Sequence, residues 1–151
     1  MTRRVYVVAA LLLLGSIDVA IGQSAQTTVE VYKSPTCGCC SKWVDHLRAN
    51  GFVVRTTDTE AMDELKASRR IPRQVQSCHT AIVSGYVVEG HVPAADVRRL
   101  LKERPAIAGI GVPGMPIGSP GMEVAGVKAQ PFDVIAFGKD GSTHVFASHG
   151  R

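Results

Sequence analysis

Four cysteines are the residues with the greatest potential for chemistry, and three of them fall within four positions. Cys37, Cys39 and Cys40 lie in the segment VYKSPTCGCC, and Cys78 follows later in SCHTA. Cys37 and Cys40 have the C-x-x-C spacing of thiol redox proteins. The thiolate is the form of cysteine that attacks disulfides and binds soft metal ions. The sequence therefore indicates either dithiol redox chemistry or a soft-metal site.

The cysteine-rich segment lies where a predicted strand gives way to a predicted helix. Residues 28–33 alternate apolar and polar side chains, which is typical of a strand. Ser34-Pro35-Thr36 ends it, and a helix is expected from about Cys40 to Asn50. Free N–H groups and the helix dipole favour negative charge at such a point, so thiolates are stabilised there.

The cysteine count favours metal binding over a simple dithiol. A redox catalyst gains little from two further thiols, which invite wrong disulfides. Soft thiolates select copper(I), zinc or iron–sulfur clusters. Zinc sites built from four cysteines usually use two well-separated pairs. Adjacent Cys39 and Cys40 suit copper(I) better, because thiolates can bridge several copper ions in a polynuclear cluster.

A disulfide between Cys37 and Cys40, with Cys39 and Cys78 buried or paired, is the alternative. The two pictures are compatible, because a disulfide could be reduced before metal enters.

Auxiliary ligands are less well defined by the sequence. His79 follows Cys78, but neighbours on a strand point to opposite faces, so a ligand and a hydrogen-bonded histidine beneath the site are both open. Met115 and Met122 lie in a glycine- and proline-rich stretch, where each could cover the sulfur site or simply plug the loop onto the core. His91, which precedes a predicted helix, is expected to be structural or on the surface.

The predicted elements follow the order β-α-β-α-β-β-α of the thioredoxin fold. Further strands are expected at 52–56, 80–83 and 86–89, a short helix around Met62 and Leu65, and a third helix after Pro93. Residues 106–130 are predicted to be a Gly/Pro-rich loop without helix or strand. A C-terminal β-hairpin, 132–137 and 143–147, is expected to join or cover the sheet. Cys78, at the start of the third strand, should then approach the other cysteines.

The N-terminus has the layout of a secretory signal peptide. Arg3 and Arg4 precede ten apolar residues, 5–14, and Ala20 and Gly22 suit a cleavage site. The apolar run is shorter than the roughly 20 residues of a membrane span. We expect residues 1–22 to be removed and residues 23–151 to form one periplasmic domain without a membrane span. An uncleaved anchor is the alternative interpretation.

Charge adds little to the functional assignment. The net charge is +4. The basic residues near 98–104 lie on one predicted helix, where a solvated face is the simplest interpretation. An exported protein rarely meets nucleic acid, so no nucleic-acid partner is predicted.

The motifs together resemble the CopG-type family of small exported bacterial proteins from copper-resistance systems. The resemblance covers about residues 29–137 and is carried by VYKSPTCGCCSKWVDHLRANGF, SCHTA, GYVVEGHVPAADVRRLL and VPGMPIGSPGME. It implies a thioredoxin-like fold and copper binding through Cys37, Cys39, Cys40 and Cys78. Such a protein would sequester copper(I), pass it to a periplasmic copper-handling partner, or change its redox state.

Two other functions remain open at this point. A thiol–disulfide oxidoreductase would use Cys37 and Cys40, and Pro72 could stand for the proline that lines the active site of such enzymes, although it lies six residues before Cys78. Arsenate reduction is weaker, because its thioredoxin-like relatives work in a reducing cytosol.

Overall fold

A computed structural model describes residues 27–151, so the expected signal peptide, 1–22, lies outside the described residues. The strands are β1 (Thr28–Lys33), β2 (Val53–Asp58), β3 (Thr80–Val83), β4 (Tyr86–Glu89), β5 (Gly109–Gly111), β6 (Phe132–Phe137) and β7 (Thr143–His149). The helices are α1 (Gly38–Ala49), α2 (Met62–Ser68) and α3 (Ala94–Glu103), with a 3₁₀ turn η1 (Arg73–Val75). Within this part of the chain, no helix combines the length and hydropathy that crossing a membrane requires.

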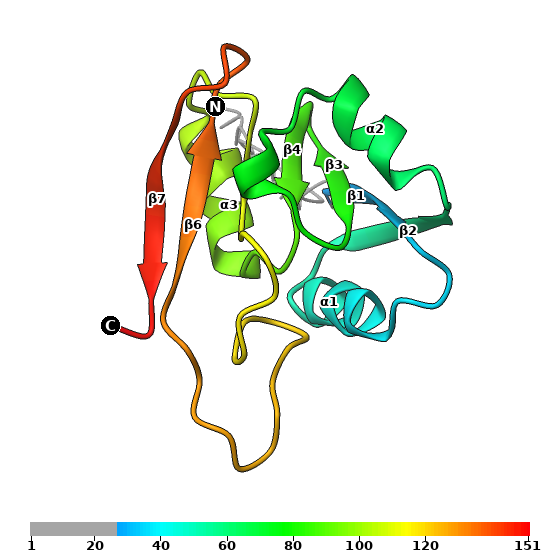
Figure 1. Cartoon of the computed structure of the whole chain (residues 1–151), viewed down its shortest axis with the longest axis vertical. Coiled ribbons are helices and arrows are strands. Elements are labelled where there is room, and N and C mark those ends of the chain that lie inside the picture. Colours follow the sequence, from blue (N-terminus) through cyan, green and yellow to red (C-terminus); the bar gives the residue numbers. More distant parts are fainter. Residues whose placement is uncertain (1–26) are drawn as a thin grey trace, which may run out of the picture.

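All seven strands form one mixed sheet in the order β2-β1-β3-β4-β5-β6-β7 (Figure 1). β1 and β2 are parallel and joined by α1, whereas β3 is antiparallel to both β1 and β4. The first seven elements therefore follow the predicted order, and the strands at 80–83 and 86–89 form the predicted antiparallel pair. Because β3 lies directly beside β1 and runs antiparallel to it, the segment before β3 and the segment after β1 lie at the same end of the sheet.

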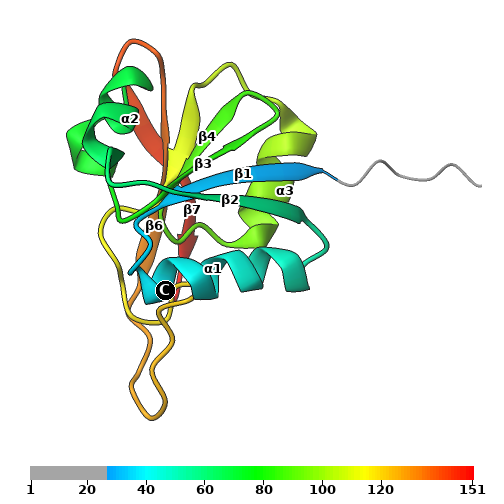
Figure 2. The same ribbon diagram turned by 90° about the vertical axis from the view of Figure 1, so that its right-hand side faces the viewer.

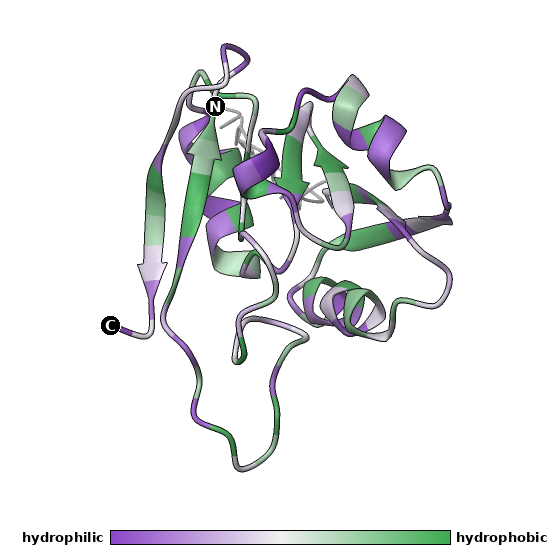
Figure 3. Ribbon diagram, in the orientation of Figure 1, coloured by the Kyte–Doolittle hydropathy of each residue, from purple (hydrophilic) through white to green (hydrophobic). Residues whose placement is uncertain are grey.

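The two longer helices cover one face of the sheet (Figure 2). Trp43 and Leu47 of α1 and Val97 and Leu100 of α3 are completely buried in one cluster with the inward side chains of β1, β3 and β4. Their spacing places these apolar residues on one stripe of each helix, which burial against the sheet requires. In Figure 3 apolar and polar residues alternate along both helices, whereas β4 and β6 are mainly apolar.

The opposite face carries a smaller core. Ile71 and Val75, around η1, pack with Val87 of β4 and Phe137 of β6. The chain therefore forms three layers, with α2 and η1 on this side of the sheet and α1 and α3 on the other (Figure 2).

The prediction of an unbroken loop over 106–130 is wrong in one place. Gly109–Gly111 forms β5, which is parallel to β4 and antiparallel to β6 and so connects the C-terminal hairpin to the sheet. A side chain at Gly109 would overlap the carbonyl of Val87, so glycine allows the close approach of these two strands. A strand of three residues that contains two glycines has no periodicity by which sequence could reveal it.

A buried ion pair fixes the segment between η1 and β3. The ammonium group of Lys66, on α2, donates to the carboxylate of Glu89, whose side chain is fully buried at the end of β4. Thr80 donates to the same carboxylate at 2.7 Å, and so does the backbone N–H of Ser77, also at 2.7 Å. Glu89 thus holds the residue that precedes Cys78.

Replacement of Lys66 by Met is expected to lower the free energy of unfolding by about 3–5 kcal/mol, because it leaves the Glu89 carboxylate buried without its counter-charge. Urea unfolding of the protein measures the loss. Lys66→Met combined with Glu89→Met should cost clearly less than the sum of the two single changes.

Asp45→Asn is the matched control, because its partner Arg48 lies on the surface and the pair is largely exposed. It should change stability by no more than about 0.5 kcal/mol. A Lys66→Met protein as stable as the Asp45→Asn protein would contradict the role given to the buried pair.

Candidate metal centre

The first turn of α1 places three cysteines at its N-terminus. Cys37 is the N-cap residue, and its Sγ accepts a hydrogen bond from the N–H of Cys40 at 3.3 Å. Cys37 and Cys40 form a disulfide with Cα atoms 5.4 Å apart, as the C-x-x-C alternative predicted. Cys40 is completely buried, whereas Cys37 is partly exposed.

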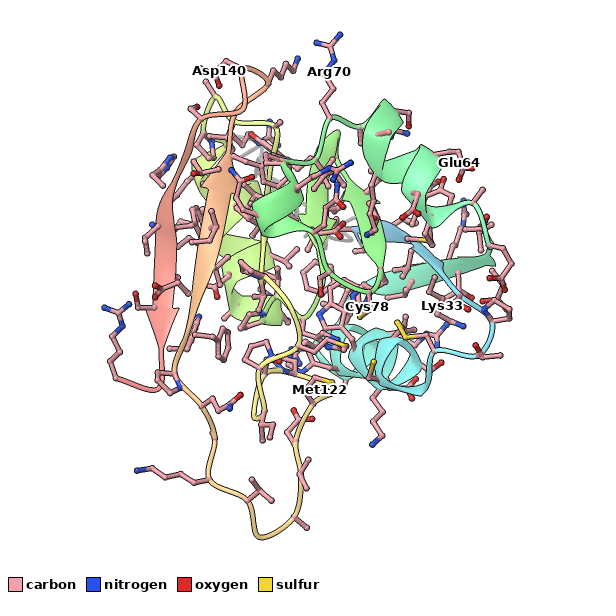
Figure 4. The ribbon with its side chains drawn as sticks, viewed as in Figure 1. Lys33, Glu64, Arg70, Cys78, Met122 and Asp140 are labelled. Carbon is pink, nitrogen blue, oxygen red and sulfur yellow. A yellow bond between two sulfur atoms is a disulfide. The ribbon has the colours of Figure 1, made fainter. Side chains whose placement is uncertain are left out.

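Cys39 and Cys78 are free thiols and both are partly exposed. Cys39 Sγ lies 3.5 Å from Cys37 Sγ. The sulfur atoms of Cys37, Cys39, Cys40 and Cys78 all lie within 4.8 Å of one another. The approach of Cys78 to the other three, which was the central expectation from the sequence, is therefore present in the structure. Figure 4 shows Cys78 close to α1.

We expected Cys78 at the start of β3. In the structure it lies two residues before that strand. Its neighbour Ser77 is held from two sides, because its N–H bonds to Glu89 and its hydroxyl donates to the carbonyl of Gly114 at 2.5 Å. The thiol of Cys78 therefore projects from a turn that hydrogen bonds hold in place, and not from the strand. Burial, together with the nearby Cys39, raises the pKa of the Cys78 thiol to about 12, so the metal-free protein holds it protonated.

Two histidines lie against Cys78. His79 Nδ1 is 3.3 Å and His91 Nε2 is 3.1 Å from Cys78 Sγ. The alternation argument against His79 fails because Cys78 and His79 precede the strand, so neighbouring side chains need not point to opposite faces. One ligand-forming atom from each of Cys78, His79 and His91 lies within 4.8 Å of the others.

His91 was missed by sequence reasoning, which placed it among structural or surface residues; the structure buries it completely beside a thiol. A signal was present in the predicted hairpin. Thr80 pairs with Glu89 across β3 and β4, and continuing this antiparallel register by two residues places Cys78 opposite His91. The register of the hairpin thus indicates that His91 lies opposite Cys78. The residues next to His91 in the sequence do not indicate this.

Both imidazole rings are buried and uncharged. Burial, reinforced by His91, lowers the pKa of His79 to about 3, and burial also lowers the pKa of His91. His79 packs on the Trp43 ring with centroids 4.4 Å apart and meets the edge of His91 at 5.1 Å. The indole N–H of Trp43 in turn donates to the carbonyl of Val92 at 2.9 Å. The rings are therefore fixed by packing.

The long loop after β5 closes over this region. The carbonyl of Pro120 accepts a hydrogen bond from His91 Nδ1 at 2.8 Å. A side chain at Gly121 would meet the backbone N of Trp43 at 2.8 Å, so this loop residue packs directly on the first turns of α1. Met122 follows and is partly buried, on the loop that passes below Cys78 in Figure 4. Met115 is 51% exposed and does not plug the loop onto the core.

The geometry brings together four sulfur atoms and two uncharged imidazoles in a partly buried site. Soft thiolates and imidazole nitrogens are the donors that copper and zinc prefer. The same disulfide could equally exchange with a substrate thiol. The donor set therefore fits a soft metal ion, and metal entry to the four-sulfur group requires reduction of Cys37–Cys40.

Comparison with known proteins narrows these possibilities. A search of curated proteins finds no match. The family described as "Protein of unknown function, DUF411" matches residues 75–122, which include Cys78, His91 and Met122. Two solved structures, forms 1 and 2 of the copper resistance protein copG, are each 40% identical to this chain, with a TM-score of 0.78. Each match covers 83% of this chain and 99% of the solved one. With that identity over almost the full length of the relative, the chain belongs to the CopG family of copper resistance proteins.

Proposed function

We propose that this protein binds copper(I) in the bacterial periplasm as part of copper resistance or homeostasis. Its ligands would be the thiolates of Cys37, Cys39, Cys40 and Cys78. The observation that carries the proposal is the gathering of these sulfur atoms within 4.8 Å of one another. The copper resistance function of the solved relatives supports the choice of metal.

The adjacency of Cys39 and Cys40 in the chain supports bridging over simple chelation, because neighbouring cysteines do not easily bind one tetrahedral ion together. A thiolate has several lone pairs, so one sulfur can bind two copper(I) ions. The four thiolates, three from the start of α1 and one from the turn before β3, could therefore hold a polynuclear cluster.

Loading requires that the disulfide first be opened. A dithiol reductant delivers two electrons and two protons to the Cys37–Cys40 bond and is itself oxidised to a disulfide. Copper(I) then displaces the protons of the resulting thiols and of Cys39 and Cys78. The high pKa of Cys78 means that this proton is lost only when the metal binds.

The export part of the proposal rests on the sequence of residues 1–22 and on the disulfide. Disulfides persist in oxidising compartments such as the periplasm and are rare in the cytosol.

The proposal also includes the fold, in which the elements from β1 to α3 form a thioredoxin-like domain. The order β2-β1-β3-β4, with β1 parallel to β2 and antiparallel to β3, supports it.

A second candidate function is thiol–disulfide exchange through Cys37 and Cys40. The disulfide at the N-terminus of α1 favours it, because a thiolate released there is stabilised by the helix dipole. The Ile71–Pro72 peptide bond is trans, as are all the peptide bonds of residues 27–151, and Pro72 is separated from β3 by η1. This proline is therefore not in the position first considered for it.

The reduced protein is expected to retain at least one copper(I) per chain against a competing chelator. Cys78→Ser and Cys39→Ser should each weaken copper(I) binding at least about tenfold, because each removes a shared thiolate. Metal analysis after desalting under argon gives the ratio, and X-ray absorption at the copper edge gives the number of sulfur neighbours.

Ser41→Ala is a suitable control on the same helix, because its exposed hydroxyl contacts only the carbonyl of Cys37. It should leave the copper ratio unchanged. Loss of all copper to the chelator from the unmodified reduced protein would end the proposal, as would sulfur-free copper neighbours.

The two candidate functions respond differently to loss of Cys39. An oxidoreductase should reduce insulin disulfides with dithiothreitol and keep that activity in Cys39→Ala, because Cys37 and Cys40 suffice. A copper protein should instead show weakened copper binding in Cys39→Ala and turnover no faster than dithiothreitol alone. Rapid insulin reduction abolished only by Cys37→Ser or Cys40→Ser would favour the enzyme.

A further inference from the structure

A cleft lies at the end of the sheet opposite the four cysteines. It has a volume of about 800 Å³ and is open to solvent. The turn Ser84-Gly85, between β3 and β4, lines the cleft, whereas Cys78 precedes the other end of β3. In Figure 4 Arg70, which also lines the cleft, lies at the end of the molecule away from Cys78. The cleft is therefore separate from the candidate metal centre.

The cleft is strongly basic. Four cations line it, from the residues after α2, the residue after α3 and the turn between β6 and β7: Arg69, Arg70, Arg104 and Lys139. Within residues 27–151 none of them forms an ion pair, and the described lining includes no aspartate or glutamate. Asp140, which follows Lys139, accepts a hydrogen bond from the hydroxyl of Ser142 at 2.7 Å instead. The C-termini of α2 and α3 add at most about half a negative charge each, so positive charge prevails.

Three residues of the cleft have a backbone conformation that side chains disfavour. Arg70, Ser84 and Arg104 have φ angles of 53°, 48° and 49°, and within residues 27–151 every non-glycine residue with a positive φ is one of these three. Arg70 and Arg104 follow the last turns of α2 and α3, where glycine is the usual residue because it has no Cβ. Strained backbone in one place is a pointer to function, because it persists only where something else requires the side chain.

Apolar side chains line the cleft together with the basic ones. Val87, Leu101 and Ile107 contribute to its walls. The hydroxyl of Tyr86 donates to the carbonyl of Pro105 at 2.9 Å, so this phenol is held in place beside the cleft. The volume lies within the range of small-molecule sites and is far larger than one inorganic anion needs. The lining therefore fits a ligand that has both an anionic group and an uncharged body.

Phosphate is the anionic group that suits three arginines and a lysine. A guanidinium binds phosphate through two parallel hydrogen bonds, and lysine adds a point charge. A phosphate monoester carries about 1.5 to 2 negative charges at pH 7, whereas a carboxylate carries one and can be satisfied by a single arginine. The number of unpaired cations therefore favours phosphate.

We propose that this cleft binds the phosphate group of an organic phosphate ester through Arg69, Arg70, Arg104 and Lys139. The ester is either a soluble molecule or the headgroup of an anionic phospholipid, because both present the same chemistry. The Arg70 side chain extends away from the body of the protein in Figure 4, so it moves inward when the ligand binds. The site goes beyond the proposed function, because it uses none of the cysteines.

The test uses Arg70→Gly and Arg104→Gly, which remove a guanidinium and relieve a positive φ at the same time. Each variant should unfold in urea at the same concentration as the unmodified protein or at a higher one. Each should bind phosphate esters at least about tenfold more weakly, because a charge-assisted hydrogen bond is lost. Calorimetric titration with glycerol 3-phosphate and co-sedimentation with phosphatidylglycerol vesicles, both at about 0.15 M salt, measure binding.

Two further variants separate the cleft from overall charge and from the backbone. Lys139→Gln removes a cation from the cleft without a change at a strained position, and it should also weaken binding. Lys42→Gln removes the same charge from the exposed face of α1, near the cysteines, and should leave binding unchanged.

The two probes distinguish the sources of the ester. Binding of glycerol 3-phosphate supports a soluble ester, and binding to phosphatidylglycerol but not to phosphatidylcholine vesicles supports a lipid headgroup. The proposal is overturned if neither probe binds, or if binding survives both glycine changes. A loss in Lys42→Gln as large as in the cleft variants also overturns it, because general surface charge would then account for the binding. None of these results affects copper binding by the cysteines.

Discussion

The antiparallel pairing of β3 with β1 is the constraint on which the candidate site depends. Glu30 to Tyr32 pair with Ile82 to Thr80, so the turn before β3 lies at the end of the sheet from which α1 begins. Separated by 38 positions in the chain from Cys40, Cys78 therefore reaches the first turn of α1. A sheet in which another strand lay between β1 and β3 would separate these sulfurs by about one strand spacing more, near 5 Å.

The pairing of β3 with β1 does not by itself place the Cys78 thiol within 4.8 Å of the other three sulfur atoms. Glu89 accepts hydrogen bonds from Ser77 and Thr80, on the two sides of the Cys78–His79 dipeptide, and Lys66 compensates its charge. This network lies on the face of the sheet opposite α1. The hydrogen bonds to Glu89 therefore fix the turn from one face, while the Cys78 thiol lies on the side of the helix. A buried ion pair is weak evidence for stability by itself. Here its structural consequence is a fixed position for Cys78.

The loop after β5 completes the surroundings of the histidines. Pro120 fixes the tautomer of His91, and Gly121 packs on α1 without a side chain that would clash with Trp43. The loop is thus part of the site, although it contributes little to the two cores. Its glycines and prolines provide the turns that let the backbone follow the end of the sheet and pack closely on α1.

The local elements were readable from the sequence because they are encoded in short-range patterns. The strand at 80–83, its partner at 86–89 and the cysteine-bearing helix follow from periodicity and turn residues, and the cysteine spacing indicated the disulfide as one alternative. β5 and the ligand-like position of His91 were not recognised, because a three-residue strand has no period and strand register is a relation between distant residues. The sequence by itself determined which donors the chain carries and the elements on which they lie. Only the tertiary structure decided that two histidines meet Cys78, because that depends on sheet order, hairpin register and a loop closing over the ring of His91.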